Sequence, residues 1–442
     1  MTQARSLPKI ESIPALPSAP PAAALKIPAQ GRLAALEHRG PLPWLQLRNA
    51  VYSAALYRKM LGRMDPRIRD GDLVKVYDRD GVVFGTGLLN RQSALAVRML
   101  SFGDTPLDES FLDERLRQAL AWRRDILQLP ARTEAWRLVH AEGDGLPGLI
   151  ADIFGDTVVV ELFSLAMFRR ADQIVQALLA QPGIRHVRFR ADAAVQQAEG
   201  FQVTADGGWP GVAGVQPPFN ADPGQDRLVI TEHGVRFQVD LAHGHKTGFF
   251  CDQRDNRLGL TTCTAQAAML DLCCYSGGFG IYALVRGQAA SVTALDLDES
   301  ALTLARRNAN LNHISARRYE TVHADAFPYL RQMRRNNRWF DVVVLDPPKL
   351  IAGREDFSEG RQSYFDLNKL ALAVVRPGGI LLTCSCSGLL DLAEFMNVLR
   401  GAARSAQRQV QIWRISGAGP DHPIRTEFPE GLYLKCLWCR VW

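Results

Sequence analysis

The sequence contains no uninterrupted apolar run of the roughly 20 residues that a membrane-spanning helix needs, so we expect no membrane association. It also lacks the regular cysteine framework of a small secreted domain, because its eight cysteines are unevenly placed and begin only at Cys251. The first residues carry no secretory signal, since Pro8, Pro14 and Pro17 interrupt any apolar stretch. These absences predict a cytoplasmic protein with reduced thiols.

A large excess of charge of one sign is missing as well. The 442 residues carry 52 Lys and Arg against 46 Asp and Glu, a formal net charge of +6. This mildly basic balance permits an anionic partner such as RNA without proving one. Hydrophobic residues make up 47% of the chain and charged residues 22%, which is ordinary for globular domains, and the length predicts about three of them.

The composition and periodicity of the sequence change along the chain. Residues 1–43 are rich in Pro and Ala and predict a flexible leader. Residues 44–104 hold short β-rich runs separated by Asp-Gly turns, which predict a small barrel. Residues 105–225 mix strand-like runs with helical periodicity at 108–130 and 167–179, a mixture typical of an α+β domain.

Strands and helices alternate over residues 226–442. This pattern predicts a parallel, doubly wound sheet, in which ligands bind at the carboxyl ends of the strands. The first strong strand contains Asp271 and leads into a loop with Ser276, Gly277 and Gly278. The glycines allow close approach of the backbone to a ligand, but a tight strand-to-helix turn would also explain them. Their spacing is not the G-x-G-x-x-G of dinucleotide enzymes.

Acidic residues follow the next two predicted strands. Asp296 comes about 20 residues after the glycine loop, a separation suited to holding two ribose hydroxyls. Asp325 lies where a carboxylate could contact an adenine amino group. Each acid could instead cap the helix that follows it, although Asp298 is better placed than Asp296 for that purpose.

The most specific feature is an apolar strand at 342–345 that runs into Asp346-Pro347-Pro348-Lys349. Two prolines cannot donate to a strand ladder, so the strand must end there. A simple strand stop explains the prolines but leaves the acid unexplained. We therefore interpret Asp346 as a functional carboxylate on a stiff turn at the ligand edge of the sheet.

This turn, together with Thr383-Cys384-Ser385-Cys386-Ser387-Gly388, resembles the RlmI type of large-subunit rRNA cytosine methyltransferases. The segments 143–152, 244–257, 421–423 and 428–435 are also similar to that family. The resemblance implies a multidomain α/β protein with an N-terminal PUA-like RNA-binding barrel, a central α+β domain and a C-terminal Rossmann-like class I methyltransferase domain. It also implies S-adenosylmethionine as cofactor, ribosomal RNA or the large ribosomal subunit as partner, and a homodimer.

The resemblance assigns roles to individual residues. Cys386 would add to carbon 6 of cytosine and so activate carbon 5, while Asp346 would hydrogen-bond the ring. Cys384 lies deeper in the apolar strand, where burial favours the inert thiol, so position also favours Cys386 as the nucleophile. The expected substrate contacts are Pro347, Pro348 and Lys349. The expected cofactor contacts are Gln253, Asp271, Ser276, Gly277, Gly278, Asp296, Asp325 and Asp346.

Several alternatives stay open. The methylated group could be carbon 5 of uracil or an exocyclic amine, although amine enzymes usually carry an aromatic residue where Lys349 stands. A non-catalytic RNA-binding assembly protein and a nicotinamide oxidoreductase are further possibilities. The pair Cys436 and Cys439 has no second well-spaced pair to complete a tetrahedral zinc site, so we expect no metal.

Overall fold

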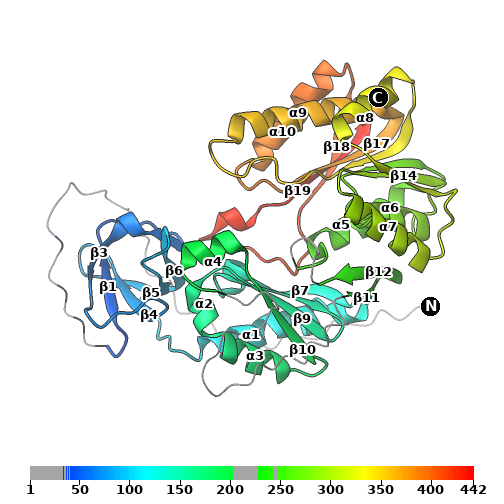
Figure 1. Ribbon diagram of the computed structural model, residues 1–442. Helices are drawn as coiled ribbons and strands as arrows, with labels where there is room; N and C mark the ends of the chain where they lie inside the picture. The colour runs from blue at the N-terminus through cyan, green and yellow to red at the C-terminus, as the bar shows by residue number, and fades with distance from the viewer. Residues whose placement is uncertain (1–32, 34–35, 37, 39, 203–226, 242–246) are drawn as a thin grey trace, which may run out of the picture.

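The computed structural model describes residues 33, 36, 38, 40–202, 227–241 and 247–442. Figure 1 shows three parts: an amino-terminal β-sheet, a central mixed domain and a carboxyl-terminal α/β domain. The predicted leader at 1–43 lies almost entirely outside the described residues, as do the predicted boundary at 225 and the residues 244–246. Among the described residues, no helix is long and apolar enough to cross a bilayer.

The amino-terminal part is a six-stranded sheet. Its strands are β1 (Trp44–Leu47), β2 (Ala55–Tyr57), β3 (Leu61–Met64), β4 (Leu73–Tyr77), β5 (Val83–Leu89) and β6 (Leu95–Phe102). They are ordered β2-β6-β5-β4-β1-β3, and only the β1–β4 pair is parallel within this sheet. Alternate apolar side chains, such as Leu45 and Leu47 of β1, point into one core because side chains alternate along a strand.

The central part packs helices against a four-stranded sheet of order β10-β9-β8-β7. Its strands are β7 (Ala135–His140), β8 (Leu149–Phe154), β9 (Thr157–Leu162) and β10 (His186–Arg190). Its helices are α1 (Phe111–Ala121), α2 (Leu165–Arg169), α3 (Ala171–Leu179) and α4 (Ala193–Glu199). A hairpin of β11 (Arg227–Glu232) and β12 (Val235–Asp240) follows, and a bridge from Thr133 to Glu232 joins it to this part.

The carboxyl-terminal part is built on a seven-stranded sheet. Its strands are β13 (Ala268–Leu272), β14 (Ser291–Asp296), β15 (Tyr319–His323), β16 (Phe340–Leu345), β17 (Val375–Ser385), β18 (Val410–Ser416) and β19 (Lys435–Val441). The order is β15-β14-β13-β16-β17-β19-β18. The first five of these are parallel, as predicted, whereas β19 is antiparallel to both β17 and β18.

Helices cover both faces of this sheet (Figure 1). They are α5 (Arg254–Leu260), α6 (Gly278–Val285), α7 (Glu299–Leu311), α8 (Ala326–Arg335), α9 (Phe357–Val374) and α10 (Leu392–Ser405). The helices α5, α6 and α7 pack on one face, and α8, α9 and α10 pack on the other. Residues 342–345 of β16 are therefore buried on both sides, which explains their continuous apolar sequence.

Candidate cofactor and catalytic site

The predicted acidic residues meet at the carboxyl edge of the parallel strands. Burial raises the pKa of the Cys273 thiol, just after β13, and the negative charges of Asp296, Asp346, Asp271 and Asp325 raise it further. All four carboxylates therefore lie close enough to affect the pKa of this one thiol. They come from the ends of four adjacent strands. The parallel sheet thus gathers residues that lie far apart in the sequence.

The loop after β13 adopts an unusual backbone. Tyr275 has a φ of 48° and Gly277 a φ of 81°, both in the left-handed region. A Cβ atom on Gly277 would lie 2.3 Å from the hydroxyl oxygen of Tyr319, so only glycine fits there. The side-chain amide of Asn308, on α7, donates a hydrogen bond to the Ser276 carbonyl at 3.0 Å and so fixes the position of the loop. Gly278 then begins α6.

Asp296, at the end of β14, lies beside this loop. Its carboxylate accepts hydrogen bonds from the backbone N–H of Tyr275 at 2.8 Å and of Asp298 at 3.0 Å. The carboxylate of Asp298, in contrast, caps α7 by accepting from Ser300 and Ala301. The two acids thus have separate tasks, and the Asp296 carboxylate is held in place by the loop and its own turn.

Asp271 is buried at the end of β13. One carboxylate oxygen accepts the backbone N–H of Gly280 at 2.9 Å, and the other has no hydrogen-bond partner among the described residues. Burial raises the pKa of Asp271 to about 7, and the charges of Asp346 and Asp296 contribute. A buried oxygen without a donor indicates that a ligand or water completes this site.

Asp325 differs from the other acids because it is exposed. It caps α8, and its carboxylate accepts the backbone N–H of Phe327 at 2.7 Å. The capping interpretation considered above therefore describes one of its contacts, although its charge still reaches the Cys273 thiol.

Gln253 connects the segment before α5 to the Asp-Pro-Pro-Lys turn. Its amide nitrogen donates to an Asp346 carboxylate oxygen at 2.9 Å. Its own carbonyl oxygen accepts from Asn256 at 2.7 Å and faces the Cys436 thiol at 3.8 Å. Asn256 was not predicted, but it fixes the orientation of the Gln253 amide and so that of Asp346.

The two candidate thiols differ in burial. Cys384 lies within β17 and is fully buried, and burial raises its pKa well above the usual value, with a further contribution from Cys436. Cys386, just beyond the strand, is half-buried, and its sulfur lies 4.0 Å from the Pro347 carbonyl oxygen. Only Cys386 is therefore both next to the turn and partly accessible.

The remaining residues of the turn differ in exposure. Pro347 is buried, whereas Pro348 and Lys349 are exposed and can meet a large substrate. Cys436 and Cys439 are three residues apart on β19 and lie in the cores on opposite faces of the sheet. They cannot share a metal ion in this arrangement, and the described part of the chain holds no group of three metal-binding side chains.

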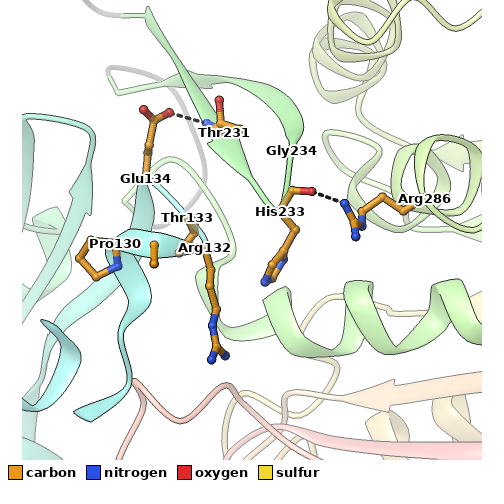
Figure 2. Close-up of a pocket in the computed structure, with 9 residues that line it drawn as sticks. Pro130, Arg132, Thr133, Glu134, Thr231, His233, Gly234 and Arg286 are labelled. Carbon is orange, nitrogen blue, oxygen red and sulfur yellow. Dashed lines mark hydrogen bonds between the residues drawn. The ribbon is translucent and has the colours of Figure 1, made fainter. Parts of the chain in front are cut away.

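A shallow pocket lies away from these residues, where the central part meets the hairpin. Figure 2 shows Arg132, His233 and Arg286 along it, with the Arg286 guanidinium donating to the His233 carbonyl at 2.6 Å. Arg286 follows the last turn of α6, whereas the candidate site lies at the first turn of that helix. The pocket therefore lies at the opposite edge of the sheet and contains none of the predicted site residues.

The clustered acids determine which ligand charge can bind at the carboxyl edge of the parallel strands. The charges of Asp346 and Asp296 act on Asp271 and contribute to its raised pKa. They would repel the phosphates of a dinucleotide and attract a cationic group. The residues present therefore fit a positively charged cofactor that also carries ribose hydroxyls.

Comparison with known proteins agrees with this geometry. Residues 220–422 match the model of a family described as S-adenosylmethionine-dependent methyltransferases, and residues 53–102 match that of a PUA-like domain. A protein of Pseudoalteromonas atlantica named ribosomal RNA large subunit methyltransferase I is 36% identical over 405 residues, covering 91% of this chain and 98% of that protein. A protein of the same name from Aeromonas hydrophila is 37% identical, covering 87% and 94%.

Two solved structures share the fold. A methyltransferase crystallised with SAH has a TM-score of 0.72 at 21% identity, over 88% of this chain and 95% of that one. A SAM-dependent methyltransferase from Streptococcus mutans has a TM-score of 0.71 at 19% identity, over 90% and 99%. These likenesses extend over the amino-terminal, central and carboxyl-terminal parts together.

Proposed function

The chain belongs to the ribosomal RNA large subunit methyltransferase I family, and from this premise we propose that it methylates carbon 5 of a cytosine through a covalent bond between Cys386 and the base. The chain is an S-adenosylmethionine-dependent enzyme whose substrate is ribosomal RNA. The resemblance inferred from the sequence is thereby confirmed. The observation that best supports the covalent step is the position of the Cys386 sulfur beside the Pro347 carbonyl.

S-adenosylmethionine fits the acidic edge, because its sulfonium and the ammonium of its methionine chain are cationic and its ribose carries two hydroxyls. When bound, it supplies an electrophilic methyl group. Asp296 would accept hydrogen bonds from the ribose hydroxyls, and the unpartnered oxygen of Asp271 would accept one from an N–H donor. Ser276, Gly277 and Gly278 would line the loop, and Asp325 would contact the adenine amino group.

Cys386 would begin the reaction as a thiolate. Its sulfur forms a bond to carbon 6 of cytosine, which places electron density on carbon 5. Carbon 5 would then accept the methyl group that the bound cofactor would supply, with the demethylated cofactor as leaving group. Loss of the carbon-5 proton to a base and expulsion of the thiolate restore the aromatic ring.

Asp346 would hold the base during this sequence. Its carboxylate faces the same edge as Cys386, and Gln253 fixes it with a hydrogen bond of 2.9 Å. A fixed carboxyl group would orient the base through a hydrogen bond to the ring, and it need not reorganise as charge develops there. The exposed Pro348 and Lys349 would contact the neighbouring RNA.

The amino-terminal sheet would add affinity for RNA without taking part in the chemistry. Arg48, Arg58 and Lys59 are exposed there, and so is Tyr57. Such residues contact phosphates and stack on bases, which makes binding depend on salt. A cytoplasmic location and a homodimer are further parts of this proposal, and both rest on family membership.

The nucleophile can be identified with large-subunit rRNA that contains 5-fluorocytosine, because fluorine cannot leave carbon 5 as a proton does. We expect wild-type enzyme to form a stable adduct that mass spectrometry maps to Cys386. The Cys386→Ala variant should form no adduct and transfer no methyl group, yet still bind the cofactor in calorimetry.

The matched control is Cys384→Ala, which removes the buried thiol two residues away. It should retain adduct formation and most of the activity. An adduct on Cys384, or one still formed by Cys386→Ala, would overturn the assignment. Nucleoside analysis of methylated natural rRNA should show 5-methylcytidine, and 5-methyluridine would contradict the proposed base.

A further inference from the structure

Lys435 is a buried lysine beside the candidate nucleophile. It begins β19 and pairs with Ser385 of β17, one residue before Cys386. Only 3% of its surface is exposed, although lysine is rarely buried to this extent without a partner of opposite charge. Its side chain passes the end of β17, where the chain turns from the strand toward α10.

Two backbone carbonyls hold the Lys435 ammonium in place. The Nζ atom donates to the carbonyl oxygen of Ser387 at 2.6 Å and to that of Tyr433 at 2.8 Å. Ser387 directly follows Cys386, so the ammonium is anchored one residue from the thiol. No salt bridge of Lys435 with a carboxylate occurs within the described ranges.

The Lys435 charge and the Cys386 sulfur influence each other. Burial lowers the pKa of Lys435 to about 8, and negative charge on Cys386 opposes that shift more than Asp391 or Cys436 does. The effect is reciprocal, because an ammonium that a thiolate stabilises must stabilise that thiolate equally. A positive charge on Lys435 and a negative charge on Cys386 therefore stabilise each other.

Two polar groups lie beside Cys386 and the residue that follows it. Pro347 presents a carbonyl oxygen to the sulfur, and Tyr364 of α9 contacts Ser387 with its hydroxyl at 3.0 Å. A thiolate at this position lies beside the Pro347 carbonyl oxygen, and a nearby cation would stabilise it at neutral pH.

We propose that Lys435 is the positioning residue that sets the reactivity of Cys386: a fixed ammonium that stabilises the thiolate before it attacks the base. This inference rests on the proposed role of Cys386 as nucleophile. The thiol proton passes to solvent, Lys435 keeps its own proton, and no bond to Lys435 forms at any step.

The test measures the ionisation of Cys386 directly, without methyl transfer. Full-length enzyme is treated with iodoacetamide at a series of pH values, and alkylation of the Cys386 peptide is quantified by mass spectrometry. In the wild type, the midpoint should lie below the pKa of about 8.5 of an unperturbed cysteine. In Lys435→Met it should rise by about one unit or more, which corresponds to roughly tenfold slower alkylation at pH 7.

Two further variants separate charge from structure. Lys435→Arg keeps a positive charge and should keep most of the shift, whereas Lys369→Met removes a half-buried lysine of α9 and should leave the midpoint unchanged. Because Lys435→Met could fail to fold, the wild-type midpoint is an independent criterion. A wild-type midpoint at or above about 8.5 would overturn the inference, and so would an unchanged midpoint in folded Lys435→Met.

The alkylation midpoint and the 5-fluorocytosine adduct together distinguish failure of this inference from failure of the proposed function. If Cys386 is not the nucleophile, wild-type enzyme forms no 5-fluorocytosine adduct at Cys386 even though its alkylation midpoint depends on Lys435. If Cys386 is the nucleophile but Lys435 does not tune it, the adduct forms and the midpoint does not respond to Lys435→Met.

Discussion

Asp296 and Asp298 are two carboxylates on one turn with different partners. Asp296 accepts from Tyr275 in the loop between β13 and α6, whereas Asp298 accepts from the first turn of α7. Their proximity makes them a natural pair for separating ligand binding from helix stability. A change at one acid acts as a control for the same change at the other.

We expect Asp296→Ala to weaken cofactor binding by about 2–4 kcal/mol, because it removes an acceptor for the two ribose hydroxyls. Isothermal titration calorimetry with S-adenosylmethionine measures the loss. Asp298→Ala should keep the affinity but lower the free energy of unfolding by about 1 kcal/mol, through the lost helix cap. Unchanged affinity in a folded Asp296→Ala variant would remove this residue from the site.

Sequence reasoning at the residue scale identifies residues whose role follows from local position. The position of the acids could be predicted because each lies at the end of a strand that could be recognised, and the capping role of Asp298 followed from its place before a helix. Asn308 and Lys435 could not, because their partners lie 32 and 48 residues away in the chain. A fully buried Asn within a helix, such as Asn308, indicates a structural hydrogen bond, but the sequence alone does not show that the residue is buried.

At the scale of elements, the predicted fold class is confirmed. It comprises a PUA-like sheet, a central α+β part and a Rossmann-like methyltransferase part. The helix predicted over 167–179 is instead two helices, α2 and α3, which meet at Arg170. Periodicity does not register a break of one residue, because the apolar face continues across it. The local sequence pattern also did not predict that β19 lies between β17 and β18 and runs antiparallel to both.

The loop between β13 and α6 depends on one glycine. Gly277→Ala would strain a left-handed backbone and also press a methyl group against the Tyr319 hydroxyl. We expect it to lower both the free energy of unfolding and the affinity for S-adenosylmethionine, as measured by urea denaturation and calorimetry.

Gly378, at the far end of β17, provides the matched control for this prediction. Its φ of 84° is similar, but a Cβ atom there meets nothing within 4 Å. Gly378→Ala should therefore cost about 1–2 kcal/mol of stability and leave cofactor affinity intact. Adding Tyr319→Phe to Gly277→Ala should recover part of the loss, since the opposing oxygen is gone. Equal affinities in the two glycine variants would show that the loop tolerates a side chain.

At the scale of the whole molecule, Asp421 connects the central and carboxyl-terminal parts. Its buried carboxylate accepts from the Arg254 guanidinium at 2.9 and 2.8 Å and from the backbone N–H of Arg137 on β7 at 2.9 Å. Its carbonyl oxygen accepts from Arg123 at 2.7 Å. Burial alone would raise the pKa of Asp421, but His422 and Arg254 outweigh it and hold the pKa well below the usual value.

We expect Asp421→Asn to lower the free energy of unfolding by about 3–5 kcal/mol, because it removes the buried counter-ion of Arg254 and leaves it with the partly exposed Asp255 at 3.5 Å. It should also split urea unfolding into two transitions, because the central and carboxyl-terminal parts lose a shared contact. The surface pair of Asp156 and Arg185, 3.9 Å apart, provides the control, and Asp156→Asn should cost at most about 1 kcal/mol.

The effect of pH gives this last prediction a second readout. The folded pKa of Asp421 is depressed, so its stabilising contribution is complete above the unfolded pKa of about 3.9 and disappears as pH falls through the folded value. The stability difference between wild type and Asp421→Asn should therefore shrink as pH falls below about 3.9. A difference that grows as pH falls below that value, or a single transition with unchanged midpoint in the variant, would show that Asp421 does not couple the two parts.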